Sequence, residues 1–199
     1  MSDRGRAELA AANRESNKTV RRLWLVAAIQ AIVARPVFLV GGAAVDLHTG
    51  SYRPTDVDIV GVVTTEEMAD LLLAGFTDLA GRHLRWDYSD GSMELIEFPD
   101  TVLDGHFEQV RLGDDVVVNV ISVESLVVDR IHQATDGSLV TYEEAVRLVA
   151  AVAHRVDWEA VAADLEGRPE AVYLRSMEWA YKILTASGRE DLGTNHFAR

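Results

Sequence analysis

Two aspartates one residue apart, Asp56 and Asp58, lie in the apolar stretch DVDIVGVV. In a strand, residues two apart point to the same face, so the two carboxylates are expected to lie close together. Like charges so placed repel and raise one another's pKa unless a cation neutralises them. Mg²⁺ prefers carboxylate oxygens and usually shares its coordination shell with substrate phosphates. The pair therefore indicates a magnesium site, and two such ions can stabilise both the entering and the leaving oxygen of a phosphoryl transfer.

A glycine pair, Gly41-Gly42, precedes the aspartates and follows a short apolar run. Without side chains, its backbone N–H groups and the N-terminus of a following helix can approach a phosphate. Arg53 would add a fixed positive charge for the same phosphates, and Thr55 completes the candidate nucleotide-binding residues of this segment. Taken singly, Gly-Gly is often only a tight turn and Asp-Val-Asp a solvated strand edge. Their order and spacing together favour a nucleotide site.

The elements that must position these residues can be read along the chain. Apolar residues recur with helical period before Pro36, and Thr64 with Glu67 has the spacing of a capping box that opens a helix closed by Gly75. The polar N-terminus as far as Asn17 is expected to be flexible. The remaining pattern predicts strands over 37–40, 56–63, 83–88, 92–99, 107–112 and 115–121, and helices over 43–48, 123–134, 141–155, 157–166 and 170–186.

This order of elements predicts an α/β (α+β) fold, with a mixed β-sheet flanked by helices and a C-terminal helical region. We place the α/β core at residues 18–135 and the helical region at 136–199, packed on the core as one unit. The length of 199 residues and the hydrophobic content of 48% suit such a compact arrangement.

The composition argues against some kinds of chemistry and some classes of partner. The net charge of −13 argues against a generally basic surface for nucleic acid. A local groove remains open if five arginines converge: Arg21, Arg22, Arg53, Arg82 and Arg85. The absence of cysteine excludes thiolate metal sites and cysteine nucleophiles. No apolar run approaches the roughly 20 residues of a membrane span, and the N-terminus lacks signal-peptide features, so we expect a cytoplasmic protein without a membrane partner.

Other motifs are less informative. His48, His83, His106, His132 and His154 show no ligand spacing, so none is expected to bind a metal. No nucleophile elbow of the Gly-x-Ser-x-Gly type and no Walker-type Gly-Lys-Ser/Thr motif is present, which sets aside hydrolase and P-loop interpretations.

The segment GGAAVDLHTGSYRPTDVDIV resembles the signature of the DNA polymerase β-like nucleotidyltransferase superfamily, in which Gly-Gly or Gly-Ser is followed by Asp-x-Asp. Within that superfamily the chain looks most like the AbiEii/MenT-type branch, whose members include toxins of toxin–antitoxin pairs. The resemblance extends from about Val37 to Leu148 and implies a nucleotidyltransferase-like fold. It also implies that Asp56 and Asp58 bind magnesium together with a third carboxylate on a neighbouring strand.

The segment MELIEFPD should supply that third carboxylate. Glu94 and Glu97 have opposite parity in a strand, so only one of them can face the aspartates. We favour Glu97 as a catalytic and metal-binding residue because IEFP looks like the corresponding segment of the family, and we keep Glu94 as the alternative.

A later segment, VISVESLVVDRI, resembles the family's stretch of strand followed by helix. The resemblance implies that Arg130, which stands where many members carry lysine, faces the triphosphate. The alternative is a surface ion pair of Arg130 with Asp129 or Glu124. Glu143 or Glu144 stands where a later acidic residue is common.

Three departures from the family pattern concern the site. Gly42 stands where serine is often found, the third carboxylate is a glutamate, and the basic residue is an arginine, which cannot act as a base.

The activity implied by the resemblance is the magnesium-dependent transfer of a nucleoside monophosphate from an NTP, such as ATP, to an acceptor hydroxyl with release of pyrophosphate. The acceptor is a tRNA or other RNA end, a protein hydroxyl or a small molecule. The alternatives are a toxin–antitoxin component regulated by a cognate antitoxin, and a non-catalytic nucleotide-binding module.

Overall fold

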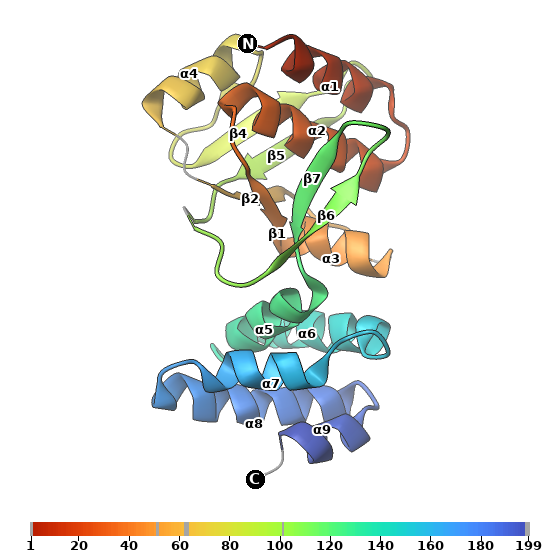
Figure 1. The fold of residues 1–199 in the computed structure, drawn as a ribbon, viewed down its shortest axis with the longest axis vertical. Coiled ribbons are helices and arrows are strands. Elements are labelled where there is room, and N and C mark those ends of the chain that lie inside the picture. Colours follow the sequence, from red (N-terminus) through yellow and green to blue (C-terminus); the bar gives the residue numbers. More distant parts are fainter. Residues whose placement is uncertain (1, 51, 62–63, 101, 198–199) are drawn as a thin grey trace. The chain divides into compact units, whose positions relative to one another are not determined.

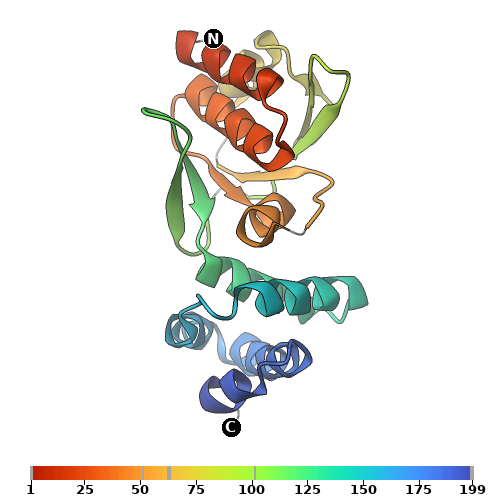
Figure 2. The same cartoon turned by 90° about the vertical axis from the view of Figure 1, so that its right-hand side faces the viewer.

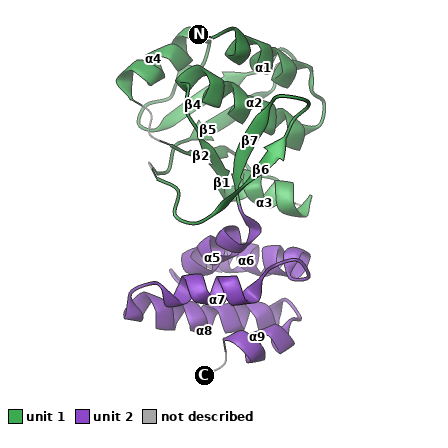
Figure 3. Ribbon diagram, in the orientation of Figure 1, with its two compact units in different colours: residues 1–121 green, residues 122–199 purple. Residues whose placement is uncertain are grey.

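The structure is a computed structural model that describes residues 2–50, 52–61, 64–100 and 102–197 (Figure 1). The chain divides into two compact units, unit 1 at Met1–Ile121 and unit 2 at Ser122–Arg199 (Figure 3). This division falls before the helix that follows Ser122, whereas the sequence analysis placed a boundary after residue 135.

Unit 1 combines helices with one sheet. Its helices are α1 (Asp3–Arg14), α2 (Lys18–Val33), α3 (Gly41–Thr49) and α4 (Thr65–Leu73). Its strands are β1 (Phe38–Val40), β2 (Val57–Val60), β3 (Thr77–Asp78), β4 (His83–Asp87), β5 (Met93–Glu97), β6 (Phe107–Arg111) and β7 (Val117–Ile121). The strand predicted over 56–63 is shorter here, and its residues 62–63 lie outside the described part of the chain. The short strand β3 was not predicted.

The strands form one sheet in the order β3-β4-β5-β2-β1-β7-β6. The pairs β1–β7 and β2–β5 are parallel, while β1–β2, β3–β4, β4–β5 and β6–β7 are antiparallel. The predicted mixed sheet is therefore confirmed. Strands β2 and β1 occupy its centre, so the segment that carries the aspartates is flanked by strands on both sides.

The two faces of the central strands differ in burial. Val57 and Ile59 of β2 and Ile96 of β5 are fully buried. Their neighbours Asp58 and Glu97 point the other way and are partly exposed. One face therefore contributes to the core of unit 1, and the opposite face is open to solvent at Asp58 and Glu97.

The N-terminal segment is an ordered helix, so the prediction of a flexible segment as far as Asn17 is wrong. Ser2 caps α1 by accepting a hydrogen bond from the Gly5 backbone N–H, and Leu9 and Ala12 are buried where α1 packs beside α2 (Figure 2). Gly5 permits this close approach, since a Cβ there would lie 2.8 Å from Ile32 Cγ1. The polar composition concealed a narrow apolar stripe with helical spacing.

The capping box predicted at the start of α4 is confirmed. The Thr64 side chain accepts from the Glu67 N–H, and the Glu67 carboxylate accepts from the Thr64 N–H. These reciprocal bonds satisfy two backbone donors that the first turn of a helix leaves without partners.

Unit 2 is helical in its described residues. It contains α5 (Val123–Ala134), α6 (Leu139–Val152), α7 (Trp158–Glu166), α8 (Glu170–Ala186) and α9 (Glu190–His196). Helices α5 to α8 match the four predicted helices to within two or three residues, and α9 was not predicted. No helix within the described residues of either unit combines the length and the apolar character that a membrane span requires.

The packing of α1 can be tested by truncating one buried side chain. Leu9→Ala should lower the free energy of unfolding by about 2 kcal/mol or more, because it opens a cavity between α1 and α2. Leu73→Ala, at a leucine that is 80% exposed rather than 6%, should change it by less than about 0.5 kcal/mol. Urea unfolding followed by circular dichroism measures both, and equal small effects would contradict the packing of α1.

Candidate active site

Three carboxylates converge on the partly exposed face of the sheet. Asp56, Asp58 and Glu97 each offer one oxygen, and these oxygens all lie within 4.8 Å of one another. All three residues are of intermediate burial, so a cation can reach them from solvent. Carboxylate oxygens in such a group suit a hard divalent cation such as Mg²⁺. The structure thus brings together the two aspartates and the glutamate that the sequence analysis favoured.

Strand register explains why these side chains meet. Asp58 lies in β2 opposite Glu97 in the parallel strand β5, so both point to the same face. Asp56 lies one residue before β2 and two residues before Asp58. Strands β2 and β5 and the residue before β2 therefore supply the whole cluster.

Gly41 allows the backbone to approach Asp58. It has a positive φ of 61°, and a Cβ at this position would lie 1.8 Å from Asp58 Oδ2. The next residue, Gly42, donates a long backbone hydrogen bond of 3.4 Å to the same oxygen. Asp58 thus lies at the N-terminus of α3, where the helix dipole favours a negative charge.

At Gly42, the side chains of Tyr52 and Pro54 leave no room for a Cβ. A Cβ at Gly42 would lie 2.8 Å from Tyr52 Cε1 and 3.3 Å from Pro54 Cβ. The glycine therefore makes room for the segment that leads into β2. A serine, which often stands here in the family that the motif resembles, would require the Tyr52 ring to move.

Glu94, the alternative third carboxylate, points to the buried face. Its carboxylate pairs with Arg22 of α2, with 3.0 Å between Arg22 Nε and Glu94 Oε1. Burial raises the pKa of Glu94, and the charge of Arg22 opposes that rise. Glu94 therefore belongs to a buried ion pair, while Glu97 belongs to the carboxylate cluster.

The other candidate nucleotide-binding residues are dispersed. Arg53 and Thr55 are exposed on the segment before β2. Arg130 lies in α5 of unit 2, where its guanidinium contacts Gln133 Oε1 at 2.8 Å, Glu144 Oε2 at 3.5 Å and Asp129 Oδ2 at 3.8 Å. The predicted contact of Arg130 with a triphosphate stays a prediction.

The arginines considered for an RNA groove mostly have partners within unit 1. Arg21 pairs with Asp90, Arg22 with Glu94 and Arg85 with Asp87, and Arg82 donates to the carbonyl oxygens of Phe98 and Pro99. Arg21 and Arg22 are also largely buried, so they are not available to line an open groove.

His83 lies beside the cluster, a neighbour that the sequence analysis missed. It faces Glu97 across the β4–β5 ladder, with 3.5 Å between His83 Nε2 and Glu97 Oε2. The sequence of the β4–β5 hairpin could have predicted this contact. A turn that pairs Tyr88 with Ser92 sets a register in which residue 83 lies opposite residue 97. The spacing of histidines along the sequence argued against a metal ligand at His83, but such spacing does not report contacts between paired strands.

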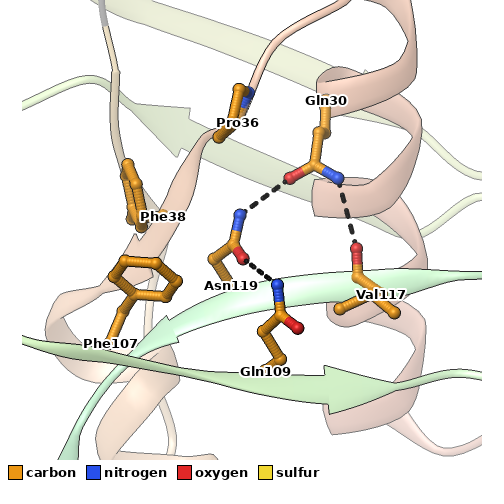
Figure 4. A pocket seen from close by; sticks show the side chains of 7 residues that line it. All are labelled: Gln30, Pro36, Phe38, Phe107, Gln109, Val117 and Asn119. Atoms are coloured by element: carbon orange, nitrogen blue, oxygen red, sulfur yellow. Dashed lines mark hydrogen bonds between the residues drawn. The ribbon is translucent and has the colours of Figure 1, made fainter.

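Unit 1 also contains a pocket of about 290 Å³ bordered by Phe38, Phe107 and three side-chain amides (Figure 4). The amides bond mainly to one another. Gln109 donates to Asn119, Asn119 donates to Gln30, and Gln30 donates to the Val117 carbonyl oxygen. This chain of hydrogen bonds ties α2, β7 and β6 together, and we assign it a structural role.

The fold is similar to that of a solved structure described as an antigenic nucleotidyltransferase-like protein from Paracoccidioides brasiliensis. The TM-score is 0.67 at 14% sequence identity, and the match covers 92% of this chain and 97% of that chain. The predicted nucleotidyltransferase-like fold is therefore confirmed. No protein-family model and no curated protein sequence matches the chain. The AbiEii/MenT-type branch and a cognate antitoxin stay predictions.

The contact between Gly41 and Asp58 can be tested with two alanine substitutions at the ends of α3. Gly41 and Gly50 have similar positive φ values, 61° and 65°, but a Cβ at Gly50 would have no atom within 4 Å. Gly50→Ala should therefore cost only backbone strain, about 1 kcal/mol of unfolding free energy. Gly41→Ala should cost about 1–3 kcal/mol more, because the methyl group must displace Asp58. Equal losses in urea unfolding would show that Asp58 does not occupy this place.

Proposed function

We propose that this chain is a magnesium-dependent nucleotidyltransferase that transfers a nucleoside monophosphate from an NTP to an acceptor hydroxyl. The observation that carries the proposal is the convergence of Asp56, Asp58 and Glu97 at the N-terminus of α3, in a chain with a nucleotidyltransferase-like fold. An all-oxygen donor set of three carboxylates open to solvent fits Mg²⁺.

The residues have distinct roles in this proposal. Asp56, Asp58 and Glu97 hold the cation, which when bound neutralises charge on the triphosphate and on the reacting oxygens. Gly41 and Gly42 would offer backbone N–H groups of the first turn of α3 to phosphate oxygens. Arg53 and Thr55 lie on the segment that packs against Gly42 through Tyr52 and Pro54. Arg130 is a further candidate for the triphosphate.

The reaction is a substitution at the α-phosphorus. The acceptor hydroxyl oxygen forms the new P–O bond, the bond to the β-phosphate bridging oxygen breaks, and pyrophosphate leaves with that electron pair. The hydroxyl proton must be removed, and the proposed acceptor is the Glu97 carboxylate oxygen that does not hold the cation, because this side chain is partly exposed. An RNA end, a protein hydroxyl or a small molecule are the proposed acceptor classes.

The proposal is tested by incubating the purified protein with Mg²⁺ and each α-labelled NTP, in parallel with total RNA, with the polypeptide itself and with small hydroxyl compounds. Asp58→Asn should reduce label transfer by at least about 100-fold, because it removes a charge that the transition state requires. Asp114→Asn, at an exposed carboxylate in the β6–β7 turn, should transfer label as the wild type does.

The acceptor that becomes labelled identifies the substrate class. Equal transfer by the wild type and Asp58→Asn would contradict the proposed mechanism. Wild-type protein that binds an NTP with Mg²⁺ but labels none of these acceptors would instead indicate a nucleotide-binding module.

A further inference from the structure

Arg22 of α2 has three partners on three different segments of unit 1. Its Nε lies 3.0 Å from Glu94 Oε1, its Nη2 donates to the Pro54 carbonyl oxygen at 3.2 Å, and its Nη1 lies 3.8 Å from Asp46 Oδ2. The side chains of Arg22, Glu94 and Asp46 are each only 9–12% exposed. A guanidinium can hold several such oxygens at once because its N–H donors point in fixed directions.

Each of these segments also carries one of the clustered carboxylates or touches one. Glu94 lies in β5 three residues before Glu97, and Pro54 lies two residues before Asp56. Asp46 lies in α3, the helix whose Gly42 N–H reaches Asp58.

Thr19 of α2 strengthens the link to α3. Its hydroxyl donates to Asp46 Oδ2 at 2.6 Å, so two side chains of α2 hold the same carboxylate. The position of α3 is thereby fixed relative to Arg22.

We propose that Arg22 is a positioning residue of the metal site, which sets the spacing of Asp56, Asp58 and Glu97 from behind the sheet. This proposal rests on the proposed function only in taking these carboxylates as the metal ligands. Arg22 does not touch the cluster. It acts through β5, the segment before β2, and α3, because a shift in any of these three would change a distance between two ligand oxygens.

The adjacent residue Arg21 provides a matched comparison. Its side chain is similarly buried, at 10% exposure, and it also pairs with an aspartate, Asp90, at 2.9 Å. Its other contacts are Ser92, the Glu15 carbonyl oxygen and the Tyr88 ring. These partners lie in the β4–β5 turn with its flanks and in the α1–α2 connection. The one nearest in sequence to a clustered carboxylate is Ser92, five residues before Glu97, whereas Pro54 lies two residues before Asp56 and Glu94 three before Glu97.

The test measures binding of Mn²⁺, an ion that also prefers oxygen ligands, by the loss of the electron paramagnetic resonance signal of the free ion. Asp58→Asn in the 199-residue chain should abolish specific binding and so define the site. Arg22→Met/Glu94→Gln removes both charges of the closer ion pair, so Glu94 is not left as a buried carboxylate opposite an apolar side chain, and Asp46 keeps its hydrogen bond from Thr19. This variant should bind Mn²⁺ about 10-fold to 100-fold more weakly than the wild type, a loss similar to that caused by removing groups that hold metal ligands in place.

The control is Arg21→Met/Asp90→Asn, which removes the neighbouring ion pair and should retain wild-type Mn²⁺ affinity even if it is equally destabilised. Arg22→Lys is a second probe, because it keeps the charge but replaces the planar fork with one ammonium group, and it should also weaken binding. Circular dichroism at the assay temperature establishes which variants are folded.

The outcomes separate the two proposals. Wild-type affinity in folded Arg22→Met/Glu94→Gln or Arg22→Lys protein would overturn the role of Arg22 and leave the metal site intact. An equal loss of affinity in the Arg21 control would also overturn it, since the effect would then follow stability rather than position. Failure of the wild type to bind Mn²⁺ would overturn the metal site itself, and the role of Arg22 with it.

Discussion

Carboxylates held close together repel one another, and the architecture of unit 1 depends on how that repulsion is accommodated. The clustered oxygens of Asp56, Asp58 and Glu97 lie within 4.8 Å of one another on a face that solvent reaches. Water screens part of the repulsion, and the N-terminus of α3 offsets part of the charge of Asp58. Backbone constraints must supply the remainder, because free side chains would rotate apart.

These constraints come from three directions. The parallel register of β2 and β5 sets Asp58 beside Glu97, and the absence of a side chain at Gly41 lets α3 begin directly against Asp58. On the buried face, the ion pair of Arg22 and Glu94 joins α2 to the sheet. The polar face thus owes its geometry to a charged contact on the opposite side of the same strands.

Much of this arrangement could be predicted from the sequence, because it depends on residues that are close together along the chain. Strand parity places Asp56 and Asp58 on one side, and the capping box at Thr64 follows from its spacing to Glu67. Only the resemblance favoured Glu97 over Glu94. Strand parity shows that the two side chains point to opposite faces, but it does not show which of them faces the aspartates. Two features were missed: Arg22 was considered only for an RNA groove, and the segment that forms α1 was expected to be flexible. Arg22 pairs with Glu94, 72 residues farther along the chain, and hydrophobic periodicity carries no information about such a contact. In α1 the apolar stripe that packs on α2 is narrow, and the polar composition concealed it.

The hydrogen bond from Gly42 to Asp58 has a consequence for how the helix end responds to anions. The carboxylate accepts from the first turn of α3, at the place where the proposed function would put a phosphate oxygen. Chloride or another simple anion must therefore compete with a tethered negative charge, which is always present at high local concentration. A ligand that brings its own cation would be favoured, because Asp58 would hold that cation and would compete less strongly for the Gly42 N–H. The start of α3 would thus bind a triphosphate that carries a metal ion in preference to a simple anion.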